Sequence, residues 1–149
     1  MNVSPLSNFK PILEVDKNFV LRKFKQTIKR IQNLGVGVVV VSPTPQSEIN
    51  TGNCLVKKYQ FNSAVNCEFR HSKTSYQFEF LTRASSFVPV YWLNENICHD
   101  QYCAAELHGK FIYRDSGHLS REGSFLLGKL NNWYDEFKNL ALCKISQNH

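Results

Sequence analysis

The apolar run from Val36 to Val41 (VGVVVV) constrains the fold more than any other feature of the sequence. A strand with one face in water alternates apolar and polar residues, whereas this run contains no polar residue. It therefore favours a strand that is covered on both faces, as in a parallel sheet. A second strand is predicted from Phe87 to Leu93, where Pro89 indicates an edge or the strand start.

Helical periodicity surrounds these two strands. Asp16 is a suitable N-cap for a helix that runs to about Asn33. A second helix is predicted from Ser72 to Arg83, and a final one begins near Ser120. Gln46 to about Lys57 is predicted to be a loop. The apolar stripe of the first helix comprises Val20, Leu21, Phe24, Ile28 and Ile31, and that of the last comprises Leu126, Leu130, Trp133, Phe137 and Leu140.

The order of helices and strands predicts an α/β fold with a parallel sheet. Two parallel strands cannot cover their own faces, so either weak strands escape detection or sequence upstream of Met1 completes the sheet. We expect a loop or arm at residues 1–15, a partial domain at residues 16–142 and a tail at residues 143–149.

The chain is basic, with 18 Lys and Arg against 12 Asp and Glu and a formal net charge of +6. Six of these basic residues lie between Lys17 and Arg30, mostly on the solvent side of the first predicted helix, which favours a solvated helix face over a nucleic-acid surface. We therefore expect no nucleic-acid partner. The chain carries no signal-peptide pattern, and its longest apolar run is too short to cross a bilayer.

Four of the five cysteines form two close pairs, Cys98 with Cys103 and Cys54 with Cys67, which leaves Cys143 over. As disulfides the pairs would stabilise the fold by about 2 and 3 kcal/mol, respectively, and would indicate an oxidising compartment. Two alternatives stay open. All five thiols could be reduced, or zinc could bind the cluster Cys98, His99, Cys103 and His108, whose spacing fits no common structural zinc pattern.

The segment YRDSGHLSREGS contains a candidate acid-base pair, Asp115 and His118. A histidine can take the proton of an attacking hydroxyl while a carboxylate fixes its tautomer. With Ser-Gly between them, both side chains fit on one loop. We expect the imidazole to face a crevice at the carboxyl edge of the strands. The alternative is that Asp115 caps a turn and His118 is an exposed residue before a helix.

The segments ICHDQYC and FIYRDSGHLSREGSFLLGKL resemble the end of the SGNH domain attached to the membrane-embedded acyltransferase-3 domain of bacterial polysaccharide and O-antigen O-acetyltransferases. VGVVVVSPTPQ is similar to a late parallel strand and loop of that family, and NCL (53–55) to its cysteine-containing segment. The resemblance spans roughly residues 20 to 135. The matching positions near the dyad are Tyr113, Asp115, His118, Leu119, Ser120, Gly123 and Ser124.

The resemblance implies a three-layer α/β/α, flavodoxin-like SGNH-hydrolase fold that is incomplete at its N-terminus. It also implies His118 as general base and Asp115 as its orienting acid. The domain would be extracytoplasmic (periplasmic), would use no cofactor, and would pass an acyl group from the acyltransferase-3 domain to a polysaccharide hydroxyl. The alternatives are an SGNH-type carbohydrate esterase and a non-catalytic, vestigial or binding module.

The nucleophile of that family is absent from this chain. Its serine belongs to a Gly-Asp-Ser motif, and no Gly-Asp-Ser occurs in the 149 residues. Ser42 follows a strand, but Pro43 cannot donate a backbone N–H to an oxyanion, so Ser42 is expected to be a turn residue. We therefore expect the chain to be inactive alone.

Overall fold

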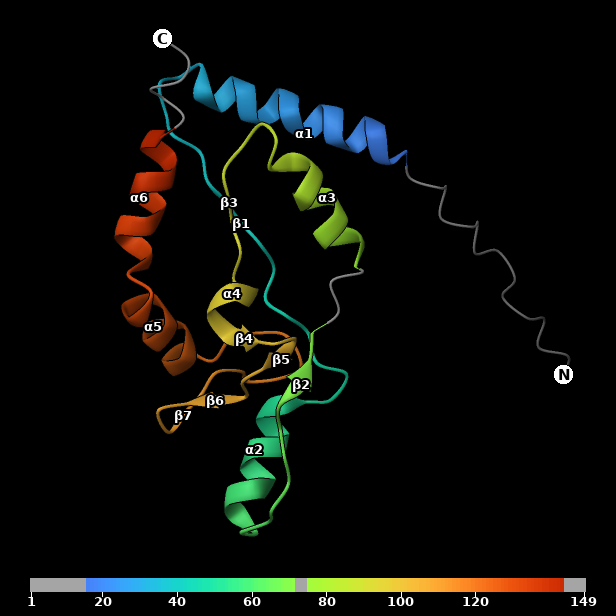
Figure 1. The fold of residues 1–149 in the computed structure, drawn as a ribbon, viewed down its shortest axis with the longest axis vertical. Coiled ribbons are helices and arrows are strands. Elements are labelled where there is room, and N and C mark those ends of the chain that lie inside the picture. Colours follow the sequence, from blue (N-terminus) through green and yellow to red (C-terminus); the bar gives the residue numbers. More distant parts are fainter. Residues whose placement is uncertain (1–15, 72–74, 144–149) are drawn as a thin grey trace, which may run out of the picture.

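The computed structural model describes residues 16–71 and 75–143 (Figure 1), so the expected arm at residues 1–15 and nearly all of the expected tail lie outside the described residues. Helices and strands alternate as far as β4, after which three more strands and two helices follow. In order they are α1 (Lys17–Gln32), β1 (Val40–Val41), α2 (Thr51–Gln60), β2 (Phe69–Arg70), α3 (Tyr76–Ala84), β3 (Val90–Tyr91), α4 (Asn94–Ile97), β4 (Cys98–His99), β5 (Tyr102–Cys103), β6 (Glu106–Leu107), β7 (Lys110–Phe111), α5 (Arg121–Leu130) and α6 (Trp133–Cys143).

The two predicted strands pair in parallel, with Val40 opposite Val90 and Val41 opposite Tyr91. The ladder continues at both ends, because the Val40 N–H donates to the Pro89 carbonyl and the Ser42 N–H donates to the Tyr91 carbonyl, each at 2.9 Å. The predicted parallel pairing is confirmed, and Pro89 precedes β3 as its missing N–H requires. Both strands are shorter than the sequence predicted.

Helices pack against β1 from different directions. Ile28 of α1 and Ala84 of α3 belong to one buried cluster that also contacts Val38 and Val40. On neighbouring positions, which face the other way in an extended chain, Gly37 lies against Ala141 of α6. Figure 1 accordingly shows β1 and β3 between α3 and α6. The apolar run is therefore flanked by helices, but its coverage is only partial, because Val36 and Val41 are 52% and 42% exposed and Gly37 to Val40 are half-buried. The chain is an α/β protein.

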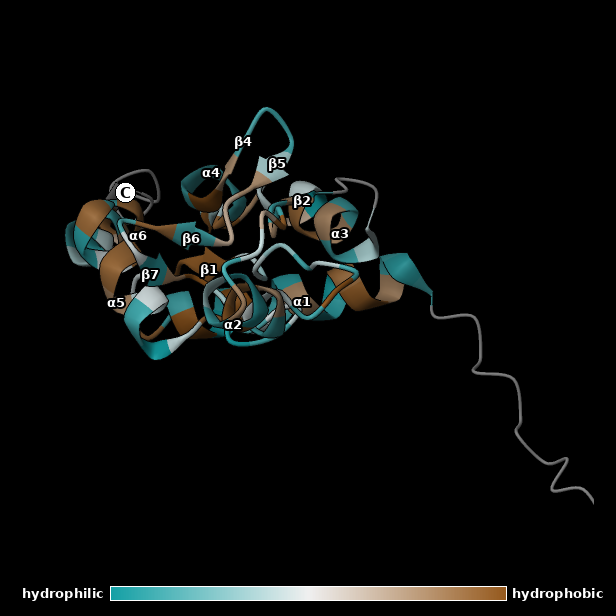
Figure 2. Cartoon of the chain, turned by 90° about the horizontal axis from the view of Figure 1, so that it is seen from below, coloured by the Kyte–Doolittle hydropathy of each residue, from teal (hydrophilic) through white to brown (hydrophobic). Residues whose placement is uncertain are grey.

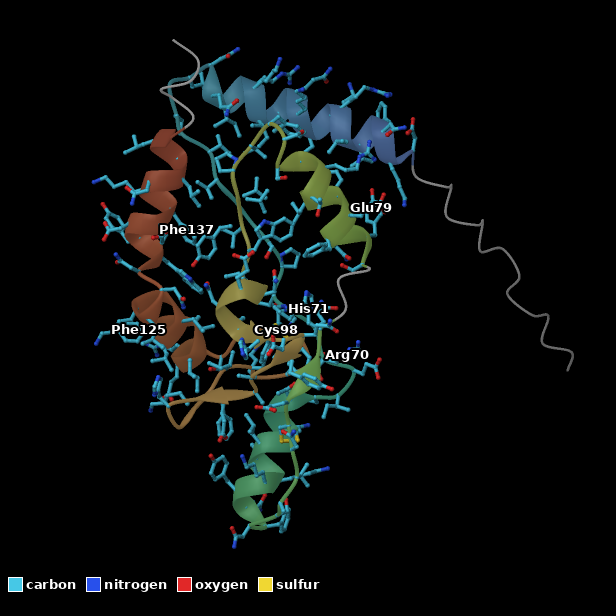
Figure 3. All side chains as sticks on the ribbon, in the orientation of Figure 1. Arg70, His71, Glu79, Cys98, Phe125 and Phe137 are labelled. Atoms are coloured by element: carbon cyan, nitrogen blue, oxygen red, sulfur yellow. A yellow bond between two sulfur atoms is a disulfide. The ribbon has the colours of Figure 1, made fainter. Side chains whose placement is uncertain are left out.

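Helix α6 also contacts β3 through an aromatic pair. The rings of Phe137 and Tyr91 lie 4.9 Å apart, nearly perpendicular to one another. Figure 3 shows Phe137 directed toward the strands, whereas Phe125 on α5 points away from the molecule and is 75% exposed. Figure 2 shows β1 as a hydrophobic segment and α1 as a helix of mixed hydropathy.

Two predictions about helices are wrong. Residues predicted as a loop form α2, because the Asn50 side chain caps it by accepting from the Asn53 N–H at 2.9 Å and Leu55 is fully buried. The predicted final helix is two helices, α5 and α6. Asn131 caps the end of α5 and Asn132 has a φ of 46°, a left-handed conformation that ends a helix.

The periodicity of the last segment was continuous across this break, but the residues that α5 buries are Gly123 and Leu127, and Leu130 is 52% exposed. The predicted helix from Ser72 to Arg83 corresponds to α3, and residues 72–74 lie outside the described residues.

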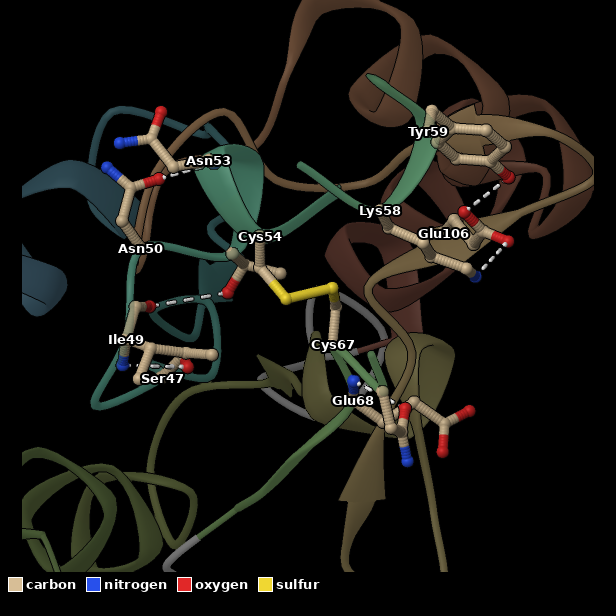
Figure 4. The surroundings of a disulfide bond; sticks show 12 residues. Ser47, Ile49, Asn50, Asn53, Cys54, Lys58, Tyr59, Cys67, Glu68 and Glu106 are labelled. Carbon is tan, nitrogen blue, oxygen red and sulfur yellow. Dashed lines mark hydrogen bonds and ion pairs between the residues drawn. A yellow bond between two sulfur atoms is a disulfide. The ribbon is translucent and has the colours of Figure 1, made fainter. Parts of the chain in front are cut away.

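Both cysteine pairs form disulfides. Cys98 and Cys103 occupy facing positions in the β4–β5 hairpin, and β2 pairs with β5 on its other side. Cys54 of α2 is bonded to Cys67, just before β2, as Figure 4 shows. The zinc alternative is not supported, because its two sulfurs are bonded to each other. Within residues 16–71 and 75–143, no cluster of three or more His, Cys, Asp or Glu residues is suited to a metal ion.

The net charge of the chain resides on α1. This helix carries six exposed basic residues and no acidic one, and the remaining 12 basic residues balance the 12 acidic residues of the chain. Among the helices of the described part, none is long and apolar enough to cross a membrane.

Candidate acid-base site

Asp115 and His118 lie on one short loop. The loop closes where the Arg114 N–H donates to the His118 carbonyl at 3.0 Å, and Tyr113 and Leu119 form an antiparallel bridge at its base. Tyr113 is fully buried in the core cluster that contains Phe69, Ile112 and Leu127. The loop is therefore anchored in the core at the residue two positions before the carboxylate.

The Asp115 carboxylate organises the turn. Its Oδ1 accepts from the N–H groups of Gly117 at 2.9 Å and His118 at 2.7 Å. These two backbone bonds, together with the His118 ring, lower the pKa of Asp115 from 3.8 to about 2. Asp115 is thus ionised at neutral pH and serves only as an acceptor.

The His118 ring is oriented by this carboxylate. Its Nδ1 lies 2.9 Å from Asp115 Oδ2 and 3.1 Å from Oδ1. Because an ionised carboxylate can only accept, Nδ1 carries the hydrogen of the neutral ring and Nε2 carries the lone pair. The predicted pair is therefore in the geometry that a general base requires.

The predicted crevice around the imidazole is not present in the part of the chain that the structure describes. The His118 side chain is 74% exposed, and that of Asp115 is 31% exposed. Arg114 Nε lies 3.5 Å from Asp115 Oδ2, on the exposed side of the loop. The Nε2 atom is consequently accessible to a hydroxyl that arrives from solvent or from another polypeptide segment.

The segment that follows β1 holds the dyad loop in place. Thr44 Oγ1 donates to the Gly117 carbonyl, and the Ser47 N–H donates to the Ser116 carbonyl at 2.7 Å. A Cβ on Gly117 would lie 3.1 Å from Cγ of Gln46, so this side chain packs directly on the turn. The dyad therefore lies at the carboxyl end of β1, where open α/β sheets form their sites.

Two helix N-termini support the same loop. A Cβ on Gly52, in the first turn of α2, would lie 2.2 Å from the Arg114 carbonyl oxygen. A Cβ on Gly123, in the first turn of α5, would lie 2.5 Å from the Ile112 carbonyl oxygen. Ser120 caps α5 as predicted, because its Oγ accepts from the Gly123 N–H at 2.8 Å. Only glycine allows these helix ends to approach the backbone so closely.

Ser42 has a structural role. It is 6% exposed, and its Oγ accepts from the Leu93 N–H at 2.9 Å and donates to the Pro43 carbonyl at 3.2 Å. Its hydroxyl thereby joins the segments that follow β1 and β3. The chain forms no turn at Ser42, so the expected turn residue is instead a link between these two segments.

A pocket of about 180 Å³ adjoins the dyad loop. Its walls come from residues 42–46 after β1, from His71 after β2, from Trp92 and Asn94 after β3, and from α3 with its N-cap Ser75. Thr44 and Gln46 line the pocket and also contact Gly117. Sequence analysis missed this pocket and the supporting residues Thr44, Ser47 and Gly52, because their contacts join distant parts of the chain.

In this α/β chain an ionised aspartate and an oriented histidine lie at the carboxyl end of the parallel strands, the same pairing of groups that serine-type acyl-transfer and ester-hydrolysis sites use. A family model described as "SGNH domain (fused to AT3 domains)", where AT3 denotes acyltransferase-3, matches residues 5–130. The chain belongs to this family, as its sequence resemblance indicated, and is an acyltransferase-associated SGNH module. No curated protein and no solved structure matches the chain.

Proposed function

We propose that the chain supplies the acid-base pair for transfer of an acyl group, in particular acetyl, to a hydroxyl of a cell-surface polysaccharide. The acyl group comes from a membrane acyltransferase-3 domain, and the reaction takes place on the extracytoplasmic side. The observation that carries the proposal is the contact of His118 Nδ1 with the Asp115 carboxylate, which leaves Nε2 open. Membership in a family of SGNH domains fused to AT3 domains supports the acyl chemistry and the membrane partner.

The proposed mechanism follows from this geometry. When a hydroxyl attacks the acyl carbonyl, Nε2 of His118 takes its proton, and the carboxylate 2.9 Å from Nδ1 stabilises the imidazolium that forms. The proton then passes to the leaving oxygen. Asp115 stays ionised throughout, because its backbone hydrogen bonds keep its pKa near 2.

The attacking hydroxyl is not assigned within this chain. No Gly-Asp-Ser occurs in its sequence, and the Ser42 hydroxyl is engaged with Leu93 and Pro43. We therefore propose that the 149 residues alone turn over no acyl ester and act when the nucleophile is provided in trans or by a covalently linked segment. We also propose a single three-layer α/β/α domain over residues 16–142, which the packing of α1, α3 and α6 around the parallel strands supports.

The test is a comparison of two histidine variants of the gene at its native locus. His118→Ala removes the proposed base, and His99→Ala is the matched control. His99 also contacts a carboxylate, with Nε2 3.2 Å from Asp100 Oδ2, but it is 95% exposed at the tip of the β4–β5 hairpin. The measured quantity is the O-acetyl content of the surface polysaccharide, determined by mass spectrometry.

Loss of the general base should slow transfer by about 10²-fold or more, so His118→Ala should remove most O-acetyl groups and His99→Ala none. An increase of O-acetyl content in His118→Ala would instead identify the protein as an esterase. Unchanged acetylation with a folded His118→Ala protein would identify a non-catalytic module and would refute the proposal.

A further inference from the structure

The pocket beside the dyad loop has a chemistry of its own. None of its lining residues is Asp, Glu, Lys or Arg. Its apolar lining combines two aromatic rings with Pro43, Pro45 and Leu81, and its polar lining consists of side-chain amides, hydroxyls and the His71 imidazole. We propose that this pocket is a subsite for one uncharged sugar ring of the acceptor glycan, with Trp92 and Phe78 against the ring and amide groups around it. The identification of that sugar as the acceptor rests on the proposed function.

Trp92 and Phe78 form the aromatic part of the pocket. Their ring centroids are 4.7 Å apart and their planes are tilted by 41°, so together they present two inclined faces. Trp92 is placed by β3, and Phe78 by the first turn of α3, where its N–H donates to the N-cap Ser75 Oγ at 3.3 Å. A sugar ring has apolar C–H faces that pack on aromatic rings, whereas its hydroxyls need polar partners.

The polar groups of the pocket are available for those hydroxyls. Within the described residues, the side-chain amides of Gln46, Gln77 and Asn94 form no hydrogen bond, and neither does the Trp92 indole N–H. The second tryptophan differs, because the Trp133 indole donates to Asn96 Oδ1 at 3.1 Å. An amide both donates and accepts, which suits a hydroxyl better than it suits a purely accepting phosphate or carboxylate.

Charge separates the candidate ligands further. The excess positive charge of the chain lies on α1, and none of the described residues that line the pocket is Lys or Arg, so the imidazole of His71 is the one basic group among them. Anionic ligands favour charged, bidentate partners such as arginine, so a phosphorylated or acidic sugar would lack its usual contacts here. The volume of about 180 Å³ is below the roughly 300 Å³ at which drug-sized pockets begin, and it suits a single ring.

The position of the pocket links it to acyl transfer. Thr44 and Gln46 form part of its wall and hold Gly117, which lies between Asp115 and His118 in the chain. A sugar in the pocket and the open Nε2 atom of His118 therefore adjoin the same short loop. The subsite would orient the acceptor, and Trp92, Gln77 and Asn94 would be positioning residues for it.

The test is a titration of the ¹⁵N-labelled full chain followed by NMR. The probes are the methyl glycosides of glucose, galactose and N-acetylglucosamine, with glucuronic acid and glucose 6-phosphate as charged counterparts. At least one neutral glycoside should saturably shift the Trp92 indole signal, and the Trp133 indole should stay unchanged as the internal reference. Gln77→Ala and Asn94→Ala should each weaken binding about fivefold, as expected for one lost hydrogen bond.

The control variant is Tyr134→Ala, which removes an aromatic ring that is 77% exposed on α6, away from the pocket residues. It should bind the glycoside like the natural chain. The inference is overturned if no neutral glycoside shifts Trp92, if the charged sugars bind equally well, or if Trp133 shifts in parallel. Binding requires no acyl chemistry, so a silent pocket together with lost acetylation in His118→Ala refutes the subsite alone. Glycoside binding at Trp92 together with unchanged acetylation in His118→Ala refutes the proposed function alone.

Discussion

Gly52→Ala is expected to destabilise the fold and to displace the dyad loop. Gly52 is buried in the first turn of α2, and a Cβ there would lie 2.2 Å from the Arg114 carbonyl oxygen and 2.6 Å from its carbonyl carbon. Since real Cβ atoms do not come closer than 3.0 Å to such atoms, α2 or the loop must move by about 0.8 Å, the difference between the two distances.

The magnitude follows from what the methyl group meets. Overpacking costs about 1–3 kcal/mol, and the upper part of this range applies because the obstacle is backbone and no side chain can rotate away. The loop is also fixed on its other side by Thr44 and Ser47. The higher helix propensity of alanine offsets this loss of stability by up to about 1 kcal/mol. The expected net loss in the free energy of unfolding is about 2 kcal/mol.

Gly128→Ala provides the matched control. Gly128 lies in α5, and its added Cβ would meet only the Trp133 ring, at 3.2 Å. This side chain can yield, so the stability should stay within about 1 kcal/mol of the natural chain. In urea titrations followed by circular dichroism, the midpoint of Gly52→Ala should fall by about 1 M, and that of Gly128→Ala should change little.

Equal midpoints for the two variants would refute the reasoning, because α2 would then not pack on Arg114 as described. A second readout tests the displacement itself. The NMR signals of His118 and Gly117 should shift in Gly52→Ala and stay in place in Gly128→Ala. Displacing a general base by about 1 Å lowers the reaction rate roughly 10²-fold. If His118 is the general base, Gly52→Ala should therefore lower acetylation as well as stability.

Three further changes test other parts of the structure. Because folding lowers the pKa of Asp115, its stabilising effect is present above pH 3.8 and is lost as the pH falls through about 2. In urea titrations, the difference in the free energy of unfolding between the natural chain and Asp115→Asn should therefore disappear as the pH falls from 3.8 to about 2. A difference that stays constant with pH would contradict the hydrogen bonds described. The double variant Cys54→Ala/Cys67→Ala should lower the free energy of unfolding by about 3 kcal/mol under non-reducing conditions, because it removes a disulfide between cysteines 13 positions apart in the sequence. A loss below about 1 kcal/mol would speak against this disulfide. The Tyr113→Phe variant should melt at the same or a higher temperature than the natural chain. The buried Tyr113 hydroxyl has no hydrogen-bond partner within residues 16–71 and 75–143, and burying such a hydroxyl costs about 1 kcal/mol or more. A lower melting temperature would show that the hydroxyl has a partner.

Short sequence patterns were sufficient to predict the first helix and the parallel strand pair. Asp16 caps α1 through its Oδ1, which accepts from the N–H groups of Asn18 and Phe19. The apolar run from Val36 to Val41 predicted a strand of a parallel sheet, and its parallel pairing with β3 is confirmed. In both cases the information lies within a few consecutive residues.

Elements that depend on distant contacts escaped prediction. The Thr-Gly-Asn-Cys start of α2 has low helix propensity, and the helix exists because Asn50 caps it and Cys54 ties it to Cys67. The break between α5 and α6 depends on Asn132 adopting a positive φ, which two consecutive asparagines permit but do not require.

The candidate site shows the same division. The spacing of Asp115 and His118 predicted their contact, because three residues suffice to form the turn. Thr44, which holds this turn, is 73 residues away from Gly117 in the chain. The exposure of His118 depends on which segments cover the loop, and no local pattern contains that information.

Because the dyad is built on four consecutive residues, the geometry within the pair and the position of the pair in the domain are encoded separately. The relative placement of carboxylate and imidazole is encoded in one turn, so it tolerates sequence change elsewhere in the domain. The position of the turn within the domain is set by its contacts with Gly52 and Thr44. Such a turn could be transplanted to another scaffold as an intact proton-accepting unit, and the recipient would then have to provide only a foundation and a direction.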